Sequence, residues 1–561
     1  MFSNLRLHNF RGFSSEQNIP VKPITLIYGA NSSGKSSILK SILLMKQTLE
    51  NGSLEPNLIT KGLYADVGNF KDFINNQDID KKYAIRFEFK ISDLKEKNRY
   101  FRPFSYRHNR VKNLNKISIE YIYKSAGNKN NLLNSINLFI NDDTEPLLCF
   151  EKTTKKANIK NRLRIRYSTS HSNKNNSDNI NSFEVKKINW ENNYFKDFWK
   201  NFVDKNKKEK FSEQVKDKIK HLEQKKSSKI SKIKQRNLFG STSEDIDNLI
   251  ETYKKVMEFL NKEPEQMLEE YKKALLDYYS KNFVIFANIL FFDESSAEAD
   301  RVDTFNALLF NSRNYYFYED LELNLDINHE FTSLLYSVCS LMQSTLNNLK
   351  YIGALRDNPE RYYLTNPTEK NYVGKSGKNT IDIIAKNKIL KNSINKQLKN
   401  LELGYSIAPR KITNEDIYLF LLKEEQSGIT VSLNDVGFGV SQILPILVQS
   451  MLSEKETILI EQPEIHIHPK LQAELGSLFA NCIKEPYNNR FIIETHSENI
   501  ILRLQKLIRK KILSSEDVSV IYVDKTEHGS VCYNLRLDDK GNFIDNWPNG
   551  FFEESYKEMF D

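Results

Sequence analysis

The sequence predicts an α/β protein with a largely parallel sheet, which an antiparallel β section and a helical insertion interrupt. Two stretches, near the N-terminus and in the final third, alternate short β-branched strands with helices, as parallel sheets do. Between them, the apolar residues recur first with period two and then with the helical period. At 561 residues the chain is too long for one compact core. We expect four segments, at residues 1–95, 96–190, 191–345 and 346–561.

The N-terminal segment contains a strand, a loop and a helix in direct succession. Ile24–Tyr28 is a short β-branched run typical of a buried strand. Gly29–Ser37 follows as a loop rich in glycine and serine, and apolar residues at helical spacing begin at Ile38. This order predicts a loop that joins the carboxyl end of a strand to the start of a helix.

The middle of the chain changes from a strand pattern to a helix pattern. Ile117–Ile122 and Leu163–Tyr167 alternate apolar with polar residues, which indicates antiparallel strands with one solvated face. From about residue 191 the apolar residues follow the helical period, first in a stripe between Phe211 and Leu222. A second stripe, Ile246–Leu260, comes after a capping-box pattern. We expect an antiparallel β section followed by a helical arm.

The final third returns to the α/β pattern. Thr457–Glu461, Phe491–Glu494 and Val518–Val523 are strand-like runs, and Leu471–Ile483 has the spacing of a helix. Open α/β sheets bind their ligands at the carboxyl ends of the strands. Polar residues at the ends of these runs are therefore candidates for a site.

Composition excludes several classes of protein. With 39% hydrophobic and 11% aromatic residues the chain can bury real cores, so it is not disordered throughout. No run reaches the roughly 18–20 apolar residues of a membrane span, and the N-terminus has no apolar signal-peptide region. The four cysteines form no Cys-x-x-Cys pair, which argues against a disulfide framework or a zinc knuckle. We expect a soluble, cytoplasmic protein.

The positive charge is concentrated in one block. The net charge is +9, but Lys95 to Arg236 holds 35 Lys and Arg against 15 Asp and Glu, a local net of +20. Such a surplus is typical of a face that binds nucleic acid. It is equally compatible with a solvated surface, because lysine is frequent throughout this chain. Both interpretations stay open.

Gly29-x-x-x-x-Gly34-Lys35-Ser36 is a P-loop motif in the required strand–loop–helix context. Its glycines let backbone N–H groups point at a phosphate, and the helix N-terminus adds its dipole. Lys35 would neutralise the β- and γ-phosphates, and the Ser36 hydroxyl would bind Mg²⁺. The candidate nucleotide-binding residues of this loop are Gly29, Asn31, Ser33, Gly34, Lys35, Ser36 and Ser37.

Candidate catalytic residues follow two of the later strands. A P-loop protein needs an acid at a strand end for the Mg²⁺ shell, and Glu461 is placed to be that second metal ligand beside Ser36. Gln462 and Glu464 come directly after it, and His496 follows the next strand. A strand that ends in Glu is common on its own, and a single His is more often structural. The P-loop makes the functional interpretation the stronger one.

A glycine-containing loop, Gly437–Gln442, precedes an apolar helix and can be an ordinary helix cap. In chain order, however, the motifs resemble the ABC-type ATPase heads of the SMC, RecF and overcoming-lysogenization-defect proteins. The resemblance is greatest to bacterial AAA-family ATPases with a large insert found in defence systems, and it covers about residues 1–95 and 345–561. It rests on the P-loop and on Asn9–Phe13, Asp66–Phe70, Gly353–Arg356, Gly437–Gln442, Glu461–Glu464, His466–Pro469 and Thr495–Ser497.

The resemblance implies an ABC-type P-loop ATPase head that uses ATP and Mg²⁺. It makes His468-Pro469 the D-loop and His496 the switch histidine that senses the γ-phosphate. It also implies a signature loop that caps the ATP of the opposite subunit, and hence a head-to-tail dimer or a higher oligomer. The residues of that loop are Gly437, Gly439, Ser441 and Gln442.

One departure concerns hydrolysis. Many relatives have Asp-Glu where this chain has Glu461-Gln462, and the second acid is their general base. A glutamine cannot accept the proton of the attacking water, so either Glu464 substitutes or hydrolysis is slow. His466 and His468 are weak candidates for metal ligands, because no third ligand is evident.

The resemblance also bears on the biological role. Some members of the broad group carry a Toprim nuclease, but no Asp-x-Asp follows His496 and no His-Asn-His-like cluster is present. We expect a sensor or regulatory ATPase of an anti-phage defence complex that controls a separate nuclease, with an HNH enzyme suspected. The alternatives are a RecF/SMC-like DNA-repair ATPase, for which the basic block would bind DNA, and a nucleotide-gated scaffold with little turnover.

Overall fold

The computed structural model describes residues 2–50, 57–92, 115–125, 131–152, 183–192, 196, 199, 205–230, 243–270, 272–273, 338, 340–364, 370–412, 417–436 and 438–548. The expected strand at 163–167 and Gly437 of the expected signature loop lie outside these ranges. Contacts divide the chain into two units. The first unit is Met1–Lys90, Ile119–Asn134 and Leu341–Asp561, and the second is Ile91–Ser118 and Ser135–Ser340. The division into four segments stays a prediction.

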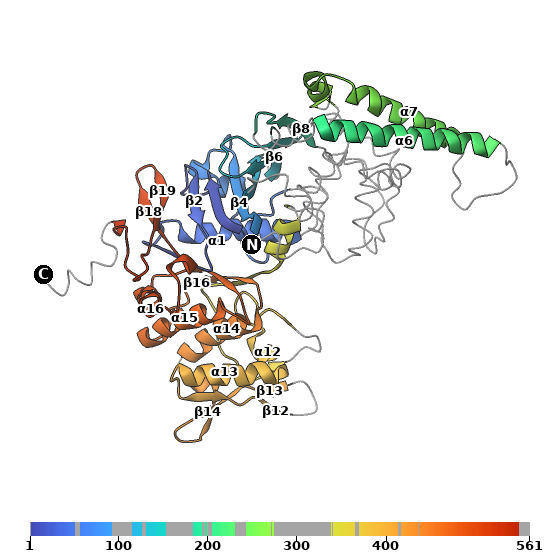
Figure 1. Cartoon of the computed structure of the whole chain (residues 1–561). Coiled ribbons are helices and arrows are strands. Elements are labelled where there is room, and N and C mark those ends of the chain that lie inside the picture. The colour runs from blue at the N-terminus through green and yellow to red at the C-terminus, as the bar shows by residue number, and fades with distance from the viewer. Residues whose placement is uncertain are drawn as a thin grey trace. The chain divides into compact units, whose positions relative to one another are not determined.

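The first unit is built around a six-stranded sheet with the strand order β19-β18-β3-β17-β16-β9 (Figure 1). Its strands are β3 (Ile24–Gly29), β9 (Leu349–Ile352), β16 (Thr457–Glu461), β17 (Arg490–Glu494), β18 (Val518–Thr526) and β19 (Gly529–Leu535). Every neighbouring pair is parallel except β18 with β19. The predicted α/β fold with a largely parallel sheet is confirmed.

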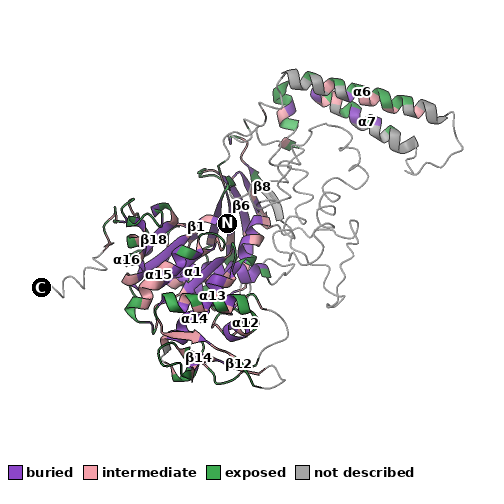
Figure 2. Ribbon diagram, turned by 60° about the horizontal axis from the view of Figure 1, so that its bottom comes forward, coloured by how far each residue is buried: buried purple, intermediate pink, exposed green. Residues whose placement is uncertain are grey.

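Burial on both faces explains why these segments form strands. All six residues of β3 are buried, as are the first four of β16. Near-continuous apolar runs of this kind are typical of parallel strands that helices cover on both faces. The sheet and α1 (Lys35–Glu50), which begins inside the P-loop motif, are coloured as largely buried in Figure 2. The carboxyl end of β3 is therefore a fixed platform for the loop that follows it.

Three further helices pack on this sheet: α14 (Phe438–Leu452), α15 (Pro469–Cys482) and α16 (Glu498–Arg509). Local sequence sets the start of two of them. Proline at the first position of α15 is compatible with a helix start, because the backbone N–H it lacks would have no intrahelical partner there. The Ser497 hydroxyl accepts from the Ile500 N–H at the start of α16, as a helix N-cap.

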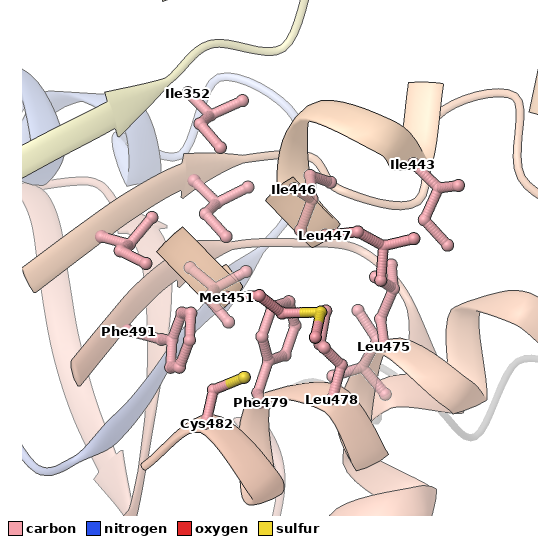
Figure 3. Close-up of a cluster of buried hydrophobic side chains, with 14 of the residues drawn as sticks. Ile352, Ile443, Ile446, Leu447, Met451, Leu475, Leu478, Phe479, Cys482 and Phe491 are labelled. Carbon is pink, nitrogen blue, oxygen red and sulfur yellow. The ribbon is translucent and has the colours of Figure 1, made fainter. Parts of the chain in front are cut away.

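Apolar side chains of α14 and α15 form the core beneath the sheet (Figure 3). The Phe479 ring of α15 meets the Phe491 ring of β17 with their centroids 4.8 Å apart. The other labelled members of this cluster are Ile352, Ile443, Ile446, Leu447, Met451, Leu475, Leu478 and Cys482. This packing fixes β16 and β17, whose carboxyl ends carry the candidate catalytic residues.

The first unit also contains antiparallel structure. β1 pairs with β2 and with β4 in an antiparallel sheet, in which β5 comes next to β4. These strands are β1 (Phe2–His8), β2 (Gln17–Pro20), β4 (Tyr83–Lys90) and β5 (Lys116–Ser125). Two short elements lie between β3 and β4 in the chain, at α2 (Phe70–Phe73) and η1 (Asn75–Gln77).

Two small three-stranded sheets lie between β9 and α14 in the chain, and the sequence analysis did not anticipate them. Their strands are β10 (Tyr363–Leu364), β11 (Tyr405–Ile407), β12 (Arg410–Lys411), β13 (Ile417–Leu419), β14 (Leu421–Glu424) and β15 (Thr430–Ser432). The other elements in this part of the chain are α12 (Thr380–Lys386), α13 (Lys388–Asn400) and η5 (Leu433–Asp435). A further short element, η6 (Ser515–Asp517), precedes β18.

The second unit combines antiparallel strands with a helical pair, as predicted. β6 (Asn131–Ile140), of which the part from Ser135 onward belongs to this unit, β7 (Leu148–Lys152) and β8 (Phe183–Ile188) pair antiparallel in that order. The helices α6 (Lys205–Ile230) and α7 (Ser243–Leu260) share a small core. Its buried members are Val215, Tyr253, Leu260 and Met267. Among the described residues, no helix combines the length and the apolar character that crossing a membrane requires.

Candidate nucleotide-binding site

The P-loop of Gly29–Ser37 joins β3 to α1, as the sequence predicts. Gly29 and Gly34 have φ angles of 145° and 114°, which residues other than glycine rarely adopt. A Cβ at Gly29 would lie 2.2 Å from the Val523 carbonyl oxygen, so only glycine fits there. Asn31 is exposed at the outside of the loop, whereas Ser33 and Ser37 are buried.

Lys35 is held inside its own loop. Its ammonium nitrogen donates to the carbonyl oxygens of Gly29 at 2.9 Å and of Ala30 at 2.8 Å. The side chain is only 4% exposed, and burial lowers the pKa of Lys35, while the carboxylates of Glu494 and Glu464 oppose that shift. The loop thus carries a buried positive charge whose hydrogen-bond partners are neutral carbonyl groups. Because a buried charge is costly unless an opposite charge compensates it, this arrangement favours the binding of an anion.

Two glutamates end neighbouring strands at the carboxyl edge of the sheet. Glu461 of β16 and Glu494 of β17 are partners in the parallel register. The Ser36 hydroxyl donates to Oε1 of Glu494 at 2.8 Å. Oε2 of Glu494 and Oε1 of Glu461 are buried and have no hydrogen-bond partner in the part of the chain that the structure describes. Burial raises the pKa of Glu494, the charge of Glu461 adds to this, and Ser36 and Lys35 oppose it.

Sequence reasoning paired Ser36 with Glu461, whereas the structure brings Ser36 to Glu494. The signal for Glu494 was present, because the runs that became β16 and β17 both end in glutamate. Parallel strands that are neighbours bring their carboxyl ends to one edge of the sheet. What the sequence did not show was that β17 lies between β3 and β16.

The structure brings together Glu464 and His496, two of the residues predicted to be catalytic. Oε1 of Glu464 accepts from the backbone N–H of His496, and Oε2 accepts from the Thr495 hydroxyl, both at 2.7 Å. Burial lowers the pKa of His496, and the charge of Lys35 lowers it further. Gln462 adopts a left-handed φ of 42°, and its N–H donates to the Glu494 carbonyl oxygen at 2.7 Å.

Arg356 is a site residue to which sequence reasoning gave no role. Its Nη2 donates to the carbonyl oxygens of Glu461 at 2.9 Å and of Gln462 at 3.1 Å. Burial lowers the pKa of Arg356 to about 10, against the charges of Glu464 and Glu461. The phenol of Tyr351 is hydrogen-bonded to the Glu461 carboxylate, and its pKa is raised chiefly by burial. Arg356, which follows β9, thus holds the end of β16 and the turn after it.

The expected signature residues begin α14. Gly439 lies against His466, two residues before the expected D-loop, since a Cβ there would be 3.3 Å from the His466 carbonyl oxygen. Ser441 and Gln442 are buried in the first turns of the helix. Nδ1 of His468 accepts from the Lys470 N–H, so this imidazole caps α15. In the described ranges, no three His, Cys, Asp or Glu side chains are grouped as a metal site.

The residues at the P-loop nevertheless fit Mg²⁺. This ion prefers oxygen ligands and takes one or two carboxylates together with phosphate oxygens, rather than a complete protein cage. The Ser36 hydroxyl and the buried carboxylate oxygens of Glu461 and Glu494 provide such a set next to Lys35. The arrangement can therefore hold a magnesium-bound polyphosphate at the carboxyl edge of β3.

Comparison with known proteins agrees with this arrangement. A family model described as an AAA ATPase domain matches residues 1–501. The chain belongs to this family of AAA ATPases. A second model, for a protein of unknown function (DUF3696), matches residues 513–561. With the strand order of the sheet, the first match confirms the expected fold of a P-loop ATPase with a largely parallel sheet.

Solved structures of SMC head domains are similar to this chain at low identity. The Pyrococcus furiosus SMC head with an extended coiled coil, bound to the C-terminal domain of ScpA, is 11% identical, with a TM-score of 0.36. That match covers 100% of this chain and 98% of the other. The SMC head domain from Thermotoga maritima is 8% identical, with a TM-score of 0.34 and 96% and 99% of the two chains covered.

Proposed function

We propose that this chain binds ATP with Mg²⁺ and hydrolyses it slowly, as the ATPase subunit of a defence complex. The observation that carries the ATPase proposal is the cluster of Lys35, Ser36, Glu461 and Glu494 at the carboxyl edge of the sheet. A buried ammonium beside a hydroxyl and two carboxylates has the charges that a metal–phosphate pair requires.

Binding draws on groups that the loop already presents. The backbone N–H groups and the N-terminus of α1 face the phosphates, and Lys35 exchanges its carbonyl partners for β- and γ-phosphate oxygens. Mg²⁺, when bound, neutralises phosphate charge and polarises the γ-phosphoryl group. Ser36 and a glutamate at the neighbouring strand ends, Glu461 or Glu494, would hold it.

Hydrolysis requires a base for the attacking water, and Gln462 cannot be one. Glu464 is the carboxylate that supports this role best, because it is two residues further along the same turn and lies against His496. Both of its oxygens already accept hydrogen bonds, from the Thr495 hydroxyl and the His496 N–H. A base that must give up one of these bonds to accept the proton of water supports slow turnover, and His496 would sense the γ-phosphate.

A complete site also needs a second head. Gly437, Gly439, Ser441 and Gln442 would cap the ATP of the opposite subunit in a head-to-tail dimer or a higher oligomer. The start of α14 contacts His466, two residues before the expected D-loop, which supports two neighbouring elements at a subunit interface. An interface of this kind makes ATP binding and assembly interdependent.

The biological role follows from the organisation of the chain. An ATPase head interrupted by a large insert resembles the Septu ATPase PtuA, which acts with an HNH nuclease encoded beside it. We therefore propose a sensor or regulatory role in anti-phage defence, with a separate nuclease as the effector. The excess positive charge of residues 95–236 favours a second candidate, a RecF/SMC-like DNA-repair ATPase. A nucleotide-gated scaffold with little turnover remains the third, because of Gln462.

The test is nucleotide binding and phosphate release by the purified protein, with and without Mg²⁺. Lys35→Ala should abolish ATP binding in calorimetry, since it removes the main counter-charge of the phosphates from a site of low dielectric. Near-normal affinity in this variant would refute the ATPase assignment. Co-expression with the product of the neighbouring gene tests the defence role, which requires a nuclease that copurifies and responds to ATP.

A further inference from the structure

We propose that Glu494, rather than Glu461, is the carboxylate that binds Mg²⁺ together with Ser36. This inference rests on the proposed ATPase function, and it assigns the metal site to the strand that follows the D-loop helix. Glu461 then does not contact the metal directly. It acts on the site through Glu494, its register partner on the neighbouring strand.

Strand order is the first argument. β17 is the direct neighbour of β3, whereas β16 is one strand further away. Neighbouring strands are about 4.8 Å apart, so the end of β16 is roughly 10 Å from the P-loop strand. The register places Glu494 beside Ile27, two residues before Gly29, and Glu461 beside Glu494. Glu494 is thus the acid within direct reach of the loop.

The contacts of the two acids are the second argument. Ser36, the P-loop residue expected to bind Mg²⁺, donates to Oε1 of Glu494 at 2.8 Å. Glu494 is 4% exposed, and its other oxygen has no hydrogen-bond partner among the described residues. A buried carboxylate with an unpaired oxygen is costly, and coordination of a cation removes that cost. Glu461 also has one buried oxygen without a partner among the described residues, but its side-chain partner is the Tyr351 phenol, whereas the partner of Glu494 is Ser36 of the P-loop.

The experiment compares Glu494→Gln with Glu461→Gln. Each variant removes one negative charge, and the two positions are register partners on neighbouring strands. Calorimetry measures the affinity for a non-hydrolysable ATP analogue, first with Mg²⁺ and then with a chelator. In the wild type Mg²⁺ should increase the affinity. In Glu494→Gln the gain in affinity that Mg²⁺ produces should be about 10- to 100-fold smaller than in the wild type, which is the usual scale for damage to a metal site. Ser36→Ala should act in the same direction, and Glu461→Gln should lose clearly less.

The alternatives separate cleanly. An equal or larger loss of the Mg²⁺ response in Glu461→Gln would overturn the assignment to Glu494. Binding of Mn²⁺ in the presence of the analogue, followed by electron paramagnetic resonance, provides a readout that does not depend on turnover, and it should weaken in Glu494→Gln. A wild-type protein that shows no nucleotide binding would refute the proposed function itself. Thermal unfolding checks that each variant is folded.

We infer further that Ser530 is a positioning residue for the P-loop. It lies at the start of β19, within the region that matches the model of unknown function. Its buried hydroxyl donates to the Ser33 carbonyl oxygen at 2.6 Å, and its backbone N–H donates to the Gly12 carbonyl oxygen at 2.7 Å. A Cβ at Gly34 would lie 3.1 Å from the same hydroxyl. The β18–β19 hairpin therefore supports the back of the phosphate-binding loop.

Ser519 provides a matched control on the neighbouring strand. Its buried hydroxyl also donates to a backbone carbonyl, that of Pro20 at 2.8 Å, but away from the P-loop. Ser530→Ala should weaken nucleotide binding about five- to tenfold, the equivalent of one lost hydrogen bond to the loop. Ser519→Ala should leave the affinity unchanged, although it should lower the melting temperature about as much as Ser530→Ala does.

A second variant makes the test independent of the serine. Ala at position 12 would bring its Cβ to 2.3 Å from the Ser530 hydroxyl, so Gly12→Ala should displace the hydroxyl and weaken binding in the same way. Unchanged nucleotide affinity in Ser530→Ala, or an equal loss in Ser519→Ala, would show that Ser530 contributes stability only.

Discussion

The Glu464 carboxylate holds the backbone of His496, accepting its N–H at 2.7 Å. The bond crosses between the turn after β16 and the residues after β17, which are 32 positions apart in the chain. The candidate base and the candidate γ-phosphate sensor therefore cannot move independently. Any displacement of His496 by a bound phosphate would also move the carboxylate that we expect to activate water.

Glu464→Gln should reduce turnover by about 10²- to 10⁴-fold, the usual contribution of general-base catalysis. The amide oxygen still accepts one of the two hydrogen bonds, so His496 stays close to its place and ATP affinity should change little. Steady-state phosphate release and calorimetry measure the two effects separately. Glu474→Gln, which removes an acid paired with Arg503 on the covering helices, is the control and should leave turnover unchanged.

Gln462→Glu is the counterpart of this test. Glutamate has the same backbone preferences as glutamine at the left-handed turn, so the variant should fold, and its turnover should be equal or higher. If Gln462→Glu raises turnover sharply while Glu464→Gln has no effect, position 462 is the base position. The wild-type chain would then be closer to a nucleotide-gated switch than to an enzyme.

The P-loop and the strands around it could be predicted from sequence because their signals are local. A β-branched run followed by Gly29–Ser37 specifies strand, loop and helix within about 20 residues, and Thr457–Glu461 is a strand with the predicted bounds. The bond between Ser36 and Glu494 joins positions 458 residues apart. It depends on strand order, which no local pattern encodes. Arg356 is likewise 105 residues from Glu461, the residue whose backbone it holds.

The two small sheets before α14 escaped prediction for a different reason. Their strands are two to four residues long, too short for a period-two pattern to stand out. Their stability comes from packing on the rest of the unit, as with Phe420 and Leu422, which belong to the same core as α14. Burial of this kind follows from tertiary structure and leaves only a weak mark on the local sequence.

Arg356→Met should lower turnover with little effect on ATP affinity. The guanidinium touches the backbone of Glu461 and Gln462, so its loss frees the turn that positions the catalytic groups. Hydrogen bonds to a charged group contribute about 1.5–3 kcal/mol, equivalent to about 10- to 100-fold in rate if they act on the transition state. Arg503→Met, which breaks an ion pair between α15 and α16, is the control. A parallel fall in affinity and rate would contradict a role confined to the turn.

His496 should make stability sensitive to mild acid. Burial lowers its pKa from the ordinary value of 6.5, so the folded state favours the neutral imidazole. As the pH falls below about 6.5, the unfolded chain binds a proton that the folded chain does not, and the free energy of unfolding decreases until the pH passes the lower folded pKa. Urea unfolding across this range should show a shallower pH dependence in His496→Gln, with the exposed His528→Gln as control.

The basic block at residues 95–236 predicts binding of nucleic acid that weakens as the salt concentration rises. Each phosphate that the protein neutralises releases counter-ions, with a log–log slope of about −0.9 per contact on duplex DNA. Reversing the charges of Arg162, Arg164 and Arg166, which lie outside the described residues, should lower both affinity and slope, because alternate residues share one face if the strand predicted from sequence forms. No gel shift at about 50 mM salt, together with loss of a partner subunit in the triple variant, would instead make this block an assembly surface.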